Sequence, residues 1–185
     1  MHKLAIIFVL AFSLGELGLL LKRRSGGTKG HDHSSLRLFW VILPVSIFAA
    51  FQAQSFFPAL TLPQKESVLA LGVVLTVSGL ILRWYAIYRL GRWFTVDVAL
   101  STGQVLMRDG PYRVIRHPSY TGALLVLAGA GVLMGNAGSI LLVTLPALAA
   151  FLYRIRIEEH ALAHAFGPEW KDYCAKSWRL IPKLY

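Results

Sequence analysis

Residues 116–159 read RHPSYTGALLVLAGAGVLMGNAGSILLVTLPALAAFLYRIRIEE and hold two apolar segments, 121–135 and 139–153, in quick succession. The Gly-Asn-Ala-Gly run at 135–138 separates the two segments and is typical of a tight turn. We therefore expect a helical hairpin that crosses a membrane and returns. The two open ends of such a hairpin lie on the same side, and both ends carry charged residues.

Three more apolar segments, 4–21, 38–60 and 68–88, precede the hairpin. Each is close to the roughly 20 residues that a helix needs to cross a bilayer core. The composition agrees, because 56% of the 185 residues are hydrophobic and 15% are charged, against about 45–50% and about 25% in soluble domains. The first segment lacks the small-residue cleavage site of a secretory signal, so we expect it to be retained. The predicted fold class is all-α, a polytopic integral membrane protein with five transmembrane helices.

Basic residues are concentrated on one side of this five-span arrangement. Of the 19 lysines and arginines, 17 fall between the first two segments, near the third-to-fourth connection or after the fifth segment, and Lys3 and Lys65 fall on the other side. Because cytoplasmic loops are enriched in Lys and Arg, we expect the N-terminus outside and the C-terminus inside. The net charge of +10 thus reports orientation, and its even spread over three segments argues against a nucleic-acid-binding patch.

Cysteine and histidine content limits disulfide and metal chemistry. Cys174 is the single cysteine, which excludes an intrachain disulfide framework and a multi-cysteine metal site. His31 and His33 flank an aspartate in a polar loop. That pair could bind a metal ion, but a solvated loop is the favoured interpretation, and we predict no metal site.

Two regions outside the spans contain further apolar residues. Residues 91–118 form a long connection that is too apolar for disorder, and loops of this length are usually functional. We expect this connection to fold back against the membrane face. The chain from Arg154 onward begins as a helix with an apolar stripe, which Gly167 and Pro168 interrupt before a further turn or two.

Charged residues stand at both open ends of the hairpin. Arg116 and His117 precede the fourth span, and Arg154, Glu158 and Glu159 follow the fifth. Each cluster has a plain interpretation: an interfacial anchor for the first, and an exposed salt bridge of little energetic value for the second. Polar groups beside apolar spans are costly, however, and the pairing of two such clusters indicates a functional site. The free N–H groups at the start of the fourth helix would favour a carboxylate there.

Three motifs in this half of the chain resemble one known family. They are RHPSYTG at 116–122, preceded by GPY at 110–112, then RxxxEExxLxxxFGxxWxxY at 154–173, and RLIPK at 179–183. From about residue 90 to its end, the chain resembles the isoprenylcysteine carboxyl methyltransferase family. The RLIPK ending also resembles that of the prokaryotic-type integral-membrane members of this family, which is related to phospholipid methyltransferases.

The resemblance implies an S-adenosylmethionine-dependent enzyme whose cytosolic loop and C-terminal helical tail form the cofactor pocket. It implies one membrane domain over 1–185, with three N-terminal spans in 1–90 on the substrate side and the catalytic half in 91–185, including the hairpin 119–153. The residues expected at the cofactor are Leu106, Tyr112, His117, Pro118, Tyr120, Gly122, Glu158, Glu159, Leu180 and Ile181. The residues expected to be catalytic are Arg116, Arg154 and Glu159. Which arginine orients the substrate and which the cofactor stays open.

The favoured reaction is methylation of the carboxylate of an isoprenylcysteine or a similar lipophilic acceptor. A carboxylate is already ionised, so the protein would supply alignment and desolvation rather than a base. A thiol or an amine acceptor would need a proton acceptor, for which His117 or a glutamate could serve. The alternatives are a phospholipid N-methyltransferase or small-thiol S-methyltransferase of the same superfamily, an NADPH-dependent sterol-type membrane reductase, and a non-catalytic membrane scaffold.

The expected partners follow from this reaction. They are a lipophilic small molecule or lipidated peptide as substrate and the lipids of the membrane, with no nucleic acid, while the oligomeric state stays open. A chain without the extra N-terminal spans of eukaryotic members predicts a prokaryotic inner (cytoplasmic) membrane.

Overall fold

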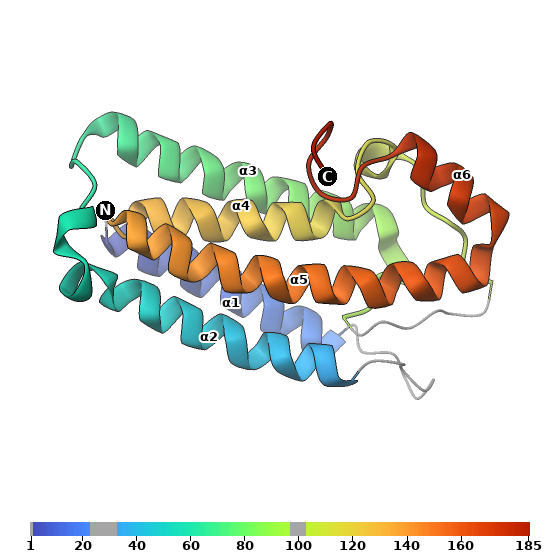
Figure 1. The fold of residues 1–185 in the computed structure, drawn as a ribbon, viewed down its shortest axis with the longest axis horizontal. Helices are drawn as coiled ribbons and strands as arrows, with labels where there is room; N and C mark the ends of the chain where they lie inside the picture. Colours follow the sequence, from blue (N-terminus) through green and yellow to red (C-terminus); the bar gives the residue numbers. More distant parts are fainter. Residues whose placement is uncertain (1, 23–32, 97–102) are drawn as a thin grey trace.

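The computed structural model describes residues 2–22, 33–96 and 103–185, and every regular element in these ranges is helical. The elements are α1 (His2–Lys22), α2 (His33–Phe56), η1 (Pro58–Leu60), α3 (Glu66–Leu90), η2 (Gly91–Trp93), η3 (Gly110–Arg113), α4 (Pro118–Leu133), α5 (Ala137–Phe166) and α6 (Pro168–Lys176). Helices α1 to α5 run along one common direction, and α6 packs at one end of this bundle (Figure 1). The predicted all-α fold is confirmed. The side chains of His31 and His33, the alternative metal ligands, lie outside the described part of the chain.

Four helices, α1, α2, α3 and α5, are long and apolar enough to cross a membrane. The sequence predicted five spans. The remaining apolar helix, α4, has 16 residues, or about 24 Å at 1.5 Å per residue, which is less than the roughly 30 Å of a bilayer core. The structure therefore supports an integral membrane protein with four spanning helices and a shorter apolar helix among them.

The second helix of the predicted hairpin, α5, is twice as long as the apolar segment 139–153 from which it was predicted. Helix α5 continues for 30 residues, so the charged residues expected beyond the span lie on the same helix as 139–153. The turn before it has the predicted position, with Gly135 at a φ of 80° and the Asn136 side chain accepting a hydrogen bond from the Gly138 N–H at 2.7 Å. At the other end, Gly167 has a φ of 51° and ends the helix, and α6 begins at Pro168.

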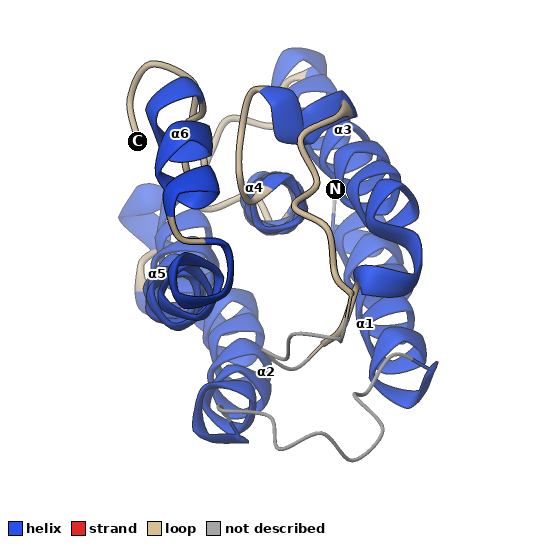
Figure 2. Ribbon diagram, turned by 90° about the vertical axis from the view of Figure 1, so that its right-hand side faces the viewer, coloured by secondary structure: helices blue, strands red, loops and turns tan. Residues whose placement is uncertain are grey.

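Helix α4 lies at the centre of the bundle, surrounded by the other helices, when the molecule is viewed end-on (Figure 2). Its backbone touches the backbone of α3 through two glycines. A Cβ atom on Gly79 would lie 2.6 Å from the Gly122 carbonyl oxygen, and a Cβ atom on Gly122 would lie 2.7 Å from the backbone nitrogen of Arg83. Small residues that let helix backbones approach are typical of packing in membranes. They bring α3 and the first turn of α4 together.

The Gly122→Ala variant is therefore expected to lower the free energy of unfolding by about 1–3 kcal/mol, because the added methyl group overlaps backbone atoms that cannot move aside. The measurement is unfolding of the purified protein by a denaturing detergent. The control is Gly18→Ala on α1, where an added Cβ has nothing within 4 Å and alanine favours the helix. Equal stability of the two variants would contradict the close contact.

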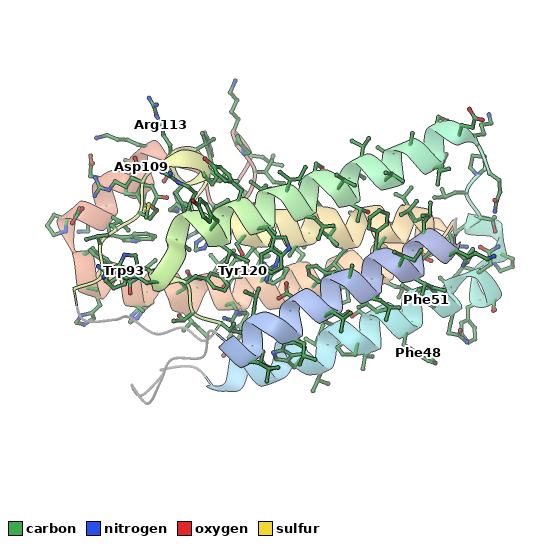
Figure 3. The ribbon with its side chains drawn as sticks, turned by 180° about the vertical axis from the view of Figure 1, so that it is seen from behind. Phe48, Phe51, Trp93, Asp109, Arg113 and Tyr120 are labelled. Atoms are coloured by element: carbon green, nitrogen blue, oxygen red, sulfur yellow. The ribbon has the colours of Figure 1, made fainter. Side chains whose placement is uncertain are left out.

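Large apolar side chains cover much of the outside of the bundle. Phe48 is 69% exposed, Ile81 65%, Ile7 58% and Leu141 54%, and Phe48 projects outward from α2 (Figure 3). Water-soluble monomers rarely expose contiguous apolar surface of this kind. These side chains therefore face lipid.

Candidate active site

A pocket opens at the end of the bundle where α3 ends, α4 begins and α5 extends toward α6, in the right-hand half of Figure 1. It holds about 910 Å³ of space, part of it open to solvent. Its apolar and aromatic lining consists of Leu90, Trp93, Phe94, Val105, Leu106, Met107, Tyr112, Tyr120, Ala161, Leu162, Trp170 and Tyr173. Its polar lining consists of Thr95, Gln104, Arg116, His117, Ser119, Arg154 and Glu158. The pocket thus combines a large apolar surface with a few charged groups, as sites for small organic molecules usually do.

The start of α4 is fixed both by its own sequence and by the C-terminal segment. Pro118 is the first helical residue, where its missing N–H leaves no hydrogen bond unmade. The backbone N–H of Arg116 donates to the Trp178 carbonyl at 2.7 Å, and the N–H of His117 donates to the Arg179 carbonyl at 3.1 Å. The C-terminal segment therefore holds in place the backbone that carries two of the polar lining residues.

Three donors converge on the Glu159 carboxylate, whose side chain is 11% exposed. Arg116 Nε lies 3.0 Å and His117 Nε2 lies 3.2 Å from Oε1. Both Nε and Nη2 of Arg179 lie 2.9 Å from Oε2. Glu159 thereby joins α5 to the start of α4 and to the C-terminal segment. It lies behind the pocket wall rather than in it.

Arg116 also connects the start of α4 to the end of α6. Its Nη1 donates to the Cys174 carbonyl at 3.2 Å, to the Ser177 hydroxyl at 3.3 Å and to the Ser177 carbonyl. An arginine that donates to the last carbonyls of a helix stabilises that helix end. Although Arg116 borders the pocket, its guanidinium is thus engaged by protein groups.

A second polar group stands in the pocket itself, around Glu158. The Tyr120 hydroxyl donates to Glu158 Oε2 at 3.0 Å, and Arg154 Nε donates to the Tyr120 hydroxyl at 3.4 Å. Arg154 Nη2 donates to the Val96 carbonyl at 2.5 Å. The Glu158 side chain is 35% exposed, so this carboxylate is accessible to a ligand, unlike that of Glu159.

Stacked rings support this polar group from the bundle side. The rings of His117 and Tyr120 are 5.7 Å apart with an interplanar angle of 15°, and those of Tyr120 and Phe151 are 4.9 Å apart with an angle of 21°. Tyr120 lies inside the bundle and Trp93 just beyond α3, whereas Asp109 and Arg113 are on the outer surface of the same end (Figure 3). Packing on both faces restricts the Tyr120 ring and therefore the position of the hydroxyl that meets Glu158.

Two buried phenols form another part of the pocket wall. The Tyr112 hydroxyl donates to the Ala86 carbonyl at 3.3 Å, and the Tyr173 hydroxyl donates to the Tyr112 carbonyl at 2.7 Å. Burial raises the pKa of both phenols above the ordinary value because an apolar surrounding disfavours the phenolate. Both therefore stay neutral hydrogen-bond donors and do not act as bases at neutral pH.

The predicted site residues divide into two groups. Those that line the pocket are Leu106, Tyr112, Arg116, His117, Tyr120, Arg154 and Glu158. The others are Glu159, Pro118, Gly122, Leu180 and Ile181, which lie outside the lining. Gly122 faces α3, and Leu180 is buried with its carbonyl bound to the Thr121 hydroxyl. Ile181 is 49% exposed on the outer surface.

Sequence reasoning did not assign a role to an ion pair beside the pocket. Arg83 Nε and Nη2 lie 2.6 Å from the two carboxylate oxygens of Glu16, and both side chains are buried. Arg83 Nη1 also donates to the carbonyl and hydroxyl oxygens of Ser119, at 3.0 and 2.8 Å. The pair therefore joins α1 and α3 to a pocket-lining residue on α4. The sequence contains a signal for this ion pair: Glu16 and Arg83 are the single charged residues of two separate apolar spans. A charged side chain inside a span is energetically costly unless it is paired.

Comparison with protein families gives one match over this region. The sequence profile of the isoprenylcysteine carboxyl methyltransferase (ICMT) family matches residues 70–164, slightly more than half of the chain. The matched region includes most of α3, all of α4 and nearly all of α5. It ends before α6 and the C-terminal segment.

Individual proteins named protein-S-isoprenylcysteine O-methyltransferase are similar to this chain over longer stretches than the family profile. Protein-S-isoprenylcysteine O-methyltransferase B of Arabidopsis thaliana is 32% identical over 123 residues, which are 65% of this chain and 61% of that protein. Protein-S-isoprenylcysteine O-methyltransferase of Tribolium castaneum is 32% identical over 137 residues, which are 72% of this chain and 48% of that protein. The chain thus spans about half to three fifths of the length of these relatives.

A solved structure of the eukaryotic intramembrane Ras methyltransferase ICMT also resembles this fold. The two chains superpose with a TM-score of 0.66 and 30% sequence identity, over 82% of this chain and 54% of that chain. The likeness therefore extends beyond the family profile to most of the helices described above.

Proposed function

Since this chain belongs to the isoprenylcysteine carboxyl methyltransferase family, we propose that it is an integral-membrane methyltransferase that uses S-adenosylmethionine. The acceptor we propose is the carboxylate of an isoprenylcysteine or of a similar lipophilic molecule. The observation that carries the proposal is the pocket at one end of the bundle, in which Glu158, Arg154 and a set of aromatic side chains face one space. The names of the relatives from Arabidopsis and Tribolium support the same acceptor.

The chemical types of the lining residues fit S-adenosylmethionine. The accessible carboxylate of Glu158 suits an ammonium group or ribose hydroxyls, and Arg154 suits a carboxylate. Trp93, Leu106 and Met107 offer an apolar surface for an adenine ring. Arg116 is bound to Glu159 and the end of α6, and Arg154 is bound to the Tyr120 hydroxyl and the Val96 carbonyl, so the choice between the two arginines stays open.

The cofactor would supply a methyl group on a sulfonium, and its transfer is a displacement that depends on alignment and exclusion of water. The protein contributes alignment through a chain of hydrogen bonds: Arg154 donates to the Tyr120 hydroxyl, which donates to Glu158. The apolar lining and the buried phenols Tyr112 and Tyr173 reduce the contact of the same space with water.

The ring of His117 lies between two carboxylates. Its Nε2 lies 3.2 Å from Glu159 and its Nδ1 lies 3.8 Å from Glu158, and this arrangement orients the ring. A carboxylate acceptor is already ionised and requires no base, whereas a thiol or an amine acceptor would need His117 or Glu158 to take up its proton.

We extend the proposal to the topology. Helix α4 would be a fifth crossing despite its length, because it is enclosed by other helices (Figure 2) and its ends need not match the bilayer thickness. The bias of lysine and arginine toward the pocket end of the chain favours an outer N-terminus and an inner C-terminus. The prokaryotic inner membrane stays a prediction, and the relatives named above are eukaryotic.

Calorimetry on the detergent-purified chain tests the cofactor. We expect S-adenosylhomocysteine to bind and NADPH not to bind, because the pocket fits the methyl donor. His117→Ala should weaken this binding while the yield of folded protein is kept, since His117 lines the pocket. Binding of NADPH alone would support the reductase instead, and binding of neither ligand would leave the scaffold as the better interpretation.

Transfer of a labelled methyl group tests the acceptor. The labelled donor is supplied to membranes that contain the chain, and the label is measured in a prenylcysteine analogue, in phospholipids and in small thiols. We expect an alkali-labile label, as in a methyl ester, on the prenylcysteine analogue. Label in phospholipids or thiols instead would overturn the proposed acceptor but keep the methyltransferase.

A further inference from the structure

The C-terminal segment after α6 folds back along the bundle instead of extending away from it (Figure 1). The Thr121 hydroxyl, in the first turn of α4, donates to the Leu180 carbonyl at 2.8 Å. Residues 178–185, named here the C-terminal loop, therefore lie at the level of the first turn of an apolar helix. In the topology proposed above, this level is at the inner boundary of the bilayer.

The C-terminal loop presents apolar side chains outward. Leu184 is 74% exposed, Ile181 49%, Trp178 42% and Tyr185 42%. Leu180 alone among its large apolar side chains is buried, at 2%. Four large apolar residues on the outside of an eight-residue loop are an unusual surface for contact with water.

The backbone of the loop is closed on itself. The N–H groups of Leu180 and Ile181 donate to the Tyr185 carbonyl at 2.9 and 3.0 Å, and those of Leu184 and Tyr185 donate to the Ile181 carbonyl at 3.1 and 3.0 Å. Backbone groups that leave water must be hydrogen-bonded internally, because lipid supplies no partners. The loop meets this requirement at these four amides.

Two exposed basic residues stand beside this surface, and the acidic Asp109 is on the outer surface of the same end (Figure 3). Lys183 is exposed in the C-terminal loop. Arg113 is also exposed, and it precedes Val114, which is 48% exposed and whose carbonyl accepts a hydrogen bond from the Trp178 N–H. Arg113 projects from the outer surface (Figure 3). Residues 177–185 contain no aspartate or glutamate. Apolar side chains beside exposed lysine and arginine are the combination that binds the interface of anionic membranes.

We propose that the C-terminal loop is an interfacial membrane anchor, with its apolar side chains among the headgroups and upper acyl chains and with Lys183 and Arg113 on lipid phosphates. The occupant is the bilayer because the loop lies level with the first turn of the apolar helix α4, and because its exposed apolar side chains stand beside the exposed basic residues Lys183 and Arg113. The proposal rests on the membrane-spanning fold and not on the proposed reaction.

The anchor would also stabilise the pocket. The carbonyls of Trp178 and Arg179, inside the loop, accept hydrogen bonds from the backbone of Arg116 and His117. Contact with the membrane would restrict the loop and, through these hydrogen bonds, the backbone at the start of α4. The pocket would then be better ordered in a bilayer than in detergent.

The test uses the full chain with an environment-sensitive nitrobenzoxadiazole label. Cys174→Ser removes the single cysteine, and Leu184→Cys then provides one labelling position at the most exposed of the large apolar side chains of the loop. The matched control is Lys171→Cys, an exposed position on α6, the helix that packs at the end of the bundle (Figure 1). Both proteins are reconstituted into phosphatidylcholine vesicles with and without phosphatidylglycerol, and with lipids that carry a doxyl quencher at a shallow depth.

We expect the label at 184 to show blue-shifted emission and strong loss of emission with doxyl lipid, more so with phosphatidylglycerol, and the label at 171 to be quenched by aqueous iodide. Equal iodide quenching at both positions would overturn the anchor. A second result would also overturn the anchor: a label at 184 that is protected from iodide but not quenched by doxyl lipid, with a protection that increases with the ratio of protein to lipid. In that case a second copy of the chain would cover the loop.

Discussion

Replacing Arg83 by methionine is expected to lower the free energy of unfolding by about 3–5 kcal/mol, because it leaves the buried Glu16 carboxylate without a partner. The two side chains are 7% and 9% exposed and make two contacts of 2.6 Å. The change also removes both hydrogen bonds to Ser119. Detergent-induced unfolding measures the stability, and S-adenosylhomocysteine binding reports the position of Ser119 in the pocket.

The double variant Glu16→Leu/Arg83→Met separates the charge from the packing. An apolar pair of similar volume often replaces a buried ion pair with little loss of stability, so we expect most of the lost stability to return. Ligand binding should stay weaker than in the unchanged chain, because Ser119 still lacks its donor. Additive effects of the two single changes would show that Glu16 and Arg83 do not interact.

Glu159→Gln is expected to weaken S-adenosylhomocysteine binding and to lower stability together. Glu159 bonds to Arg116, His117 and Arg179, and loss of its charge leaves these donors facing a neutral amide. Removing one partner of a buried, hydrogen-bonded charge pair typically has an effect of about 2–5 kcal/mol. Calorimetry measures the affinity, and detergent-induced unfolding of the same sample measures the stability.

Glu158→Gln is the matched control, since it makes the same chemical change one residue earlier. Glu158 lines the pocket and its side chain is 35% exposed, so we expect weaker binding with nearly unchanged stability. A hydrogen bond to a charged group is worth about 1.5–3 kcal/mol, which corresponds to roughly tenfold to a hundredfold in affinity. If Glu159→Gln left stability unchanged and reduced only binding, Glu159 would be a ligand of the cofactor rather than a link behind the pocket.

The helical fold could be predicted because hydropathy reports burial in lipid directly. Two interruptions of the helices could also be predicted, the turn at Gly135 and Asn136 and the break at Gly167, because each depends on local backbone preferences. The sequence did not show that the apolar segment 139–153 and the helix predicted from Arg154 form one continuous helix, α5. Helix α5 continues past Arg154 because charged residues are good helix formers once outside the bilayer, and hydropathy cannot distinguish the end of an apolar segment from the end of a helix.

The candidate site could be predicted as a set of residues but not as a geometry. The hairpin argument brought Arg116 and His117 to Glu158 and Glu159, and the structure places these four side chains together. Sequence could not show that the adjacent acids differ, with Glu158 in the pocket and Glu159 behind it, because this depends on the direction of each side chain from α5. The pair of Glu16 and Arg83, 67 residues apart, depends on tertiary packing and was not predicted.

The uninterrupted length of α5 has a consequence for how the chain tolerates insertions. Asn136 caps the first turn of this helix, and Arg154 and Glu158 lie several turns away on the same helix. One residue inserted between 141 and 150 would turn both side chains by about 100° and shift them by about 1.5 Å. The rotational position of each residue about the axis of α5, as well as its identity, therefore decides which side chains reach the pocket.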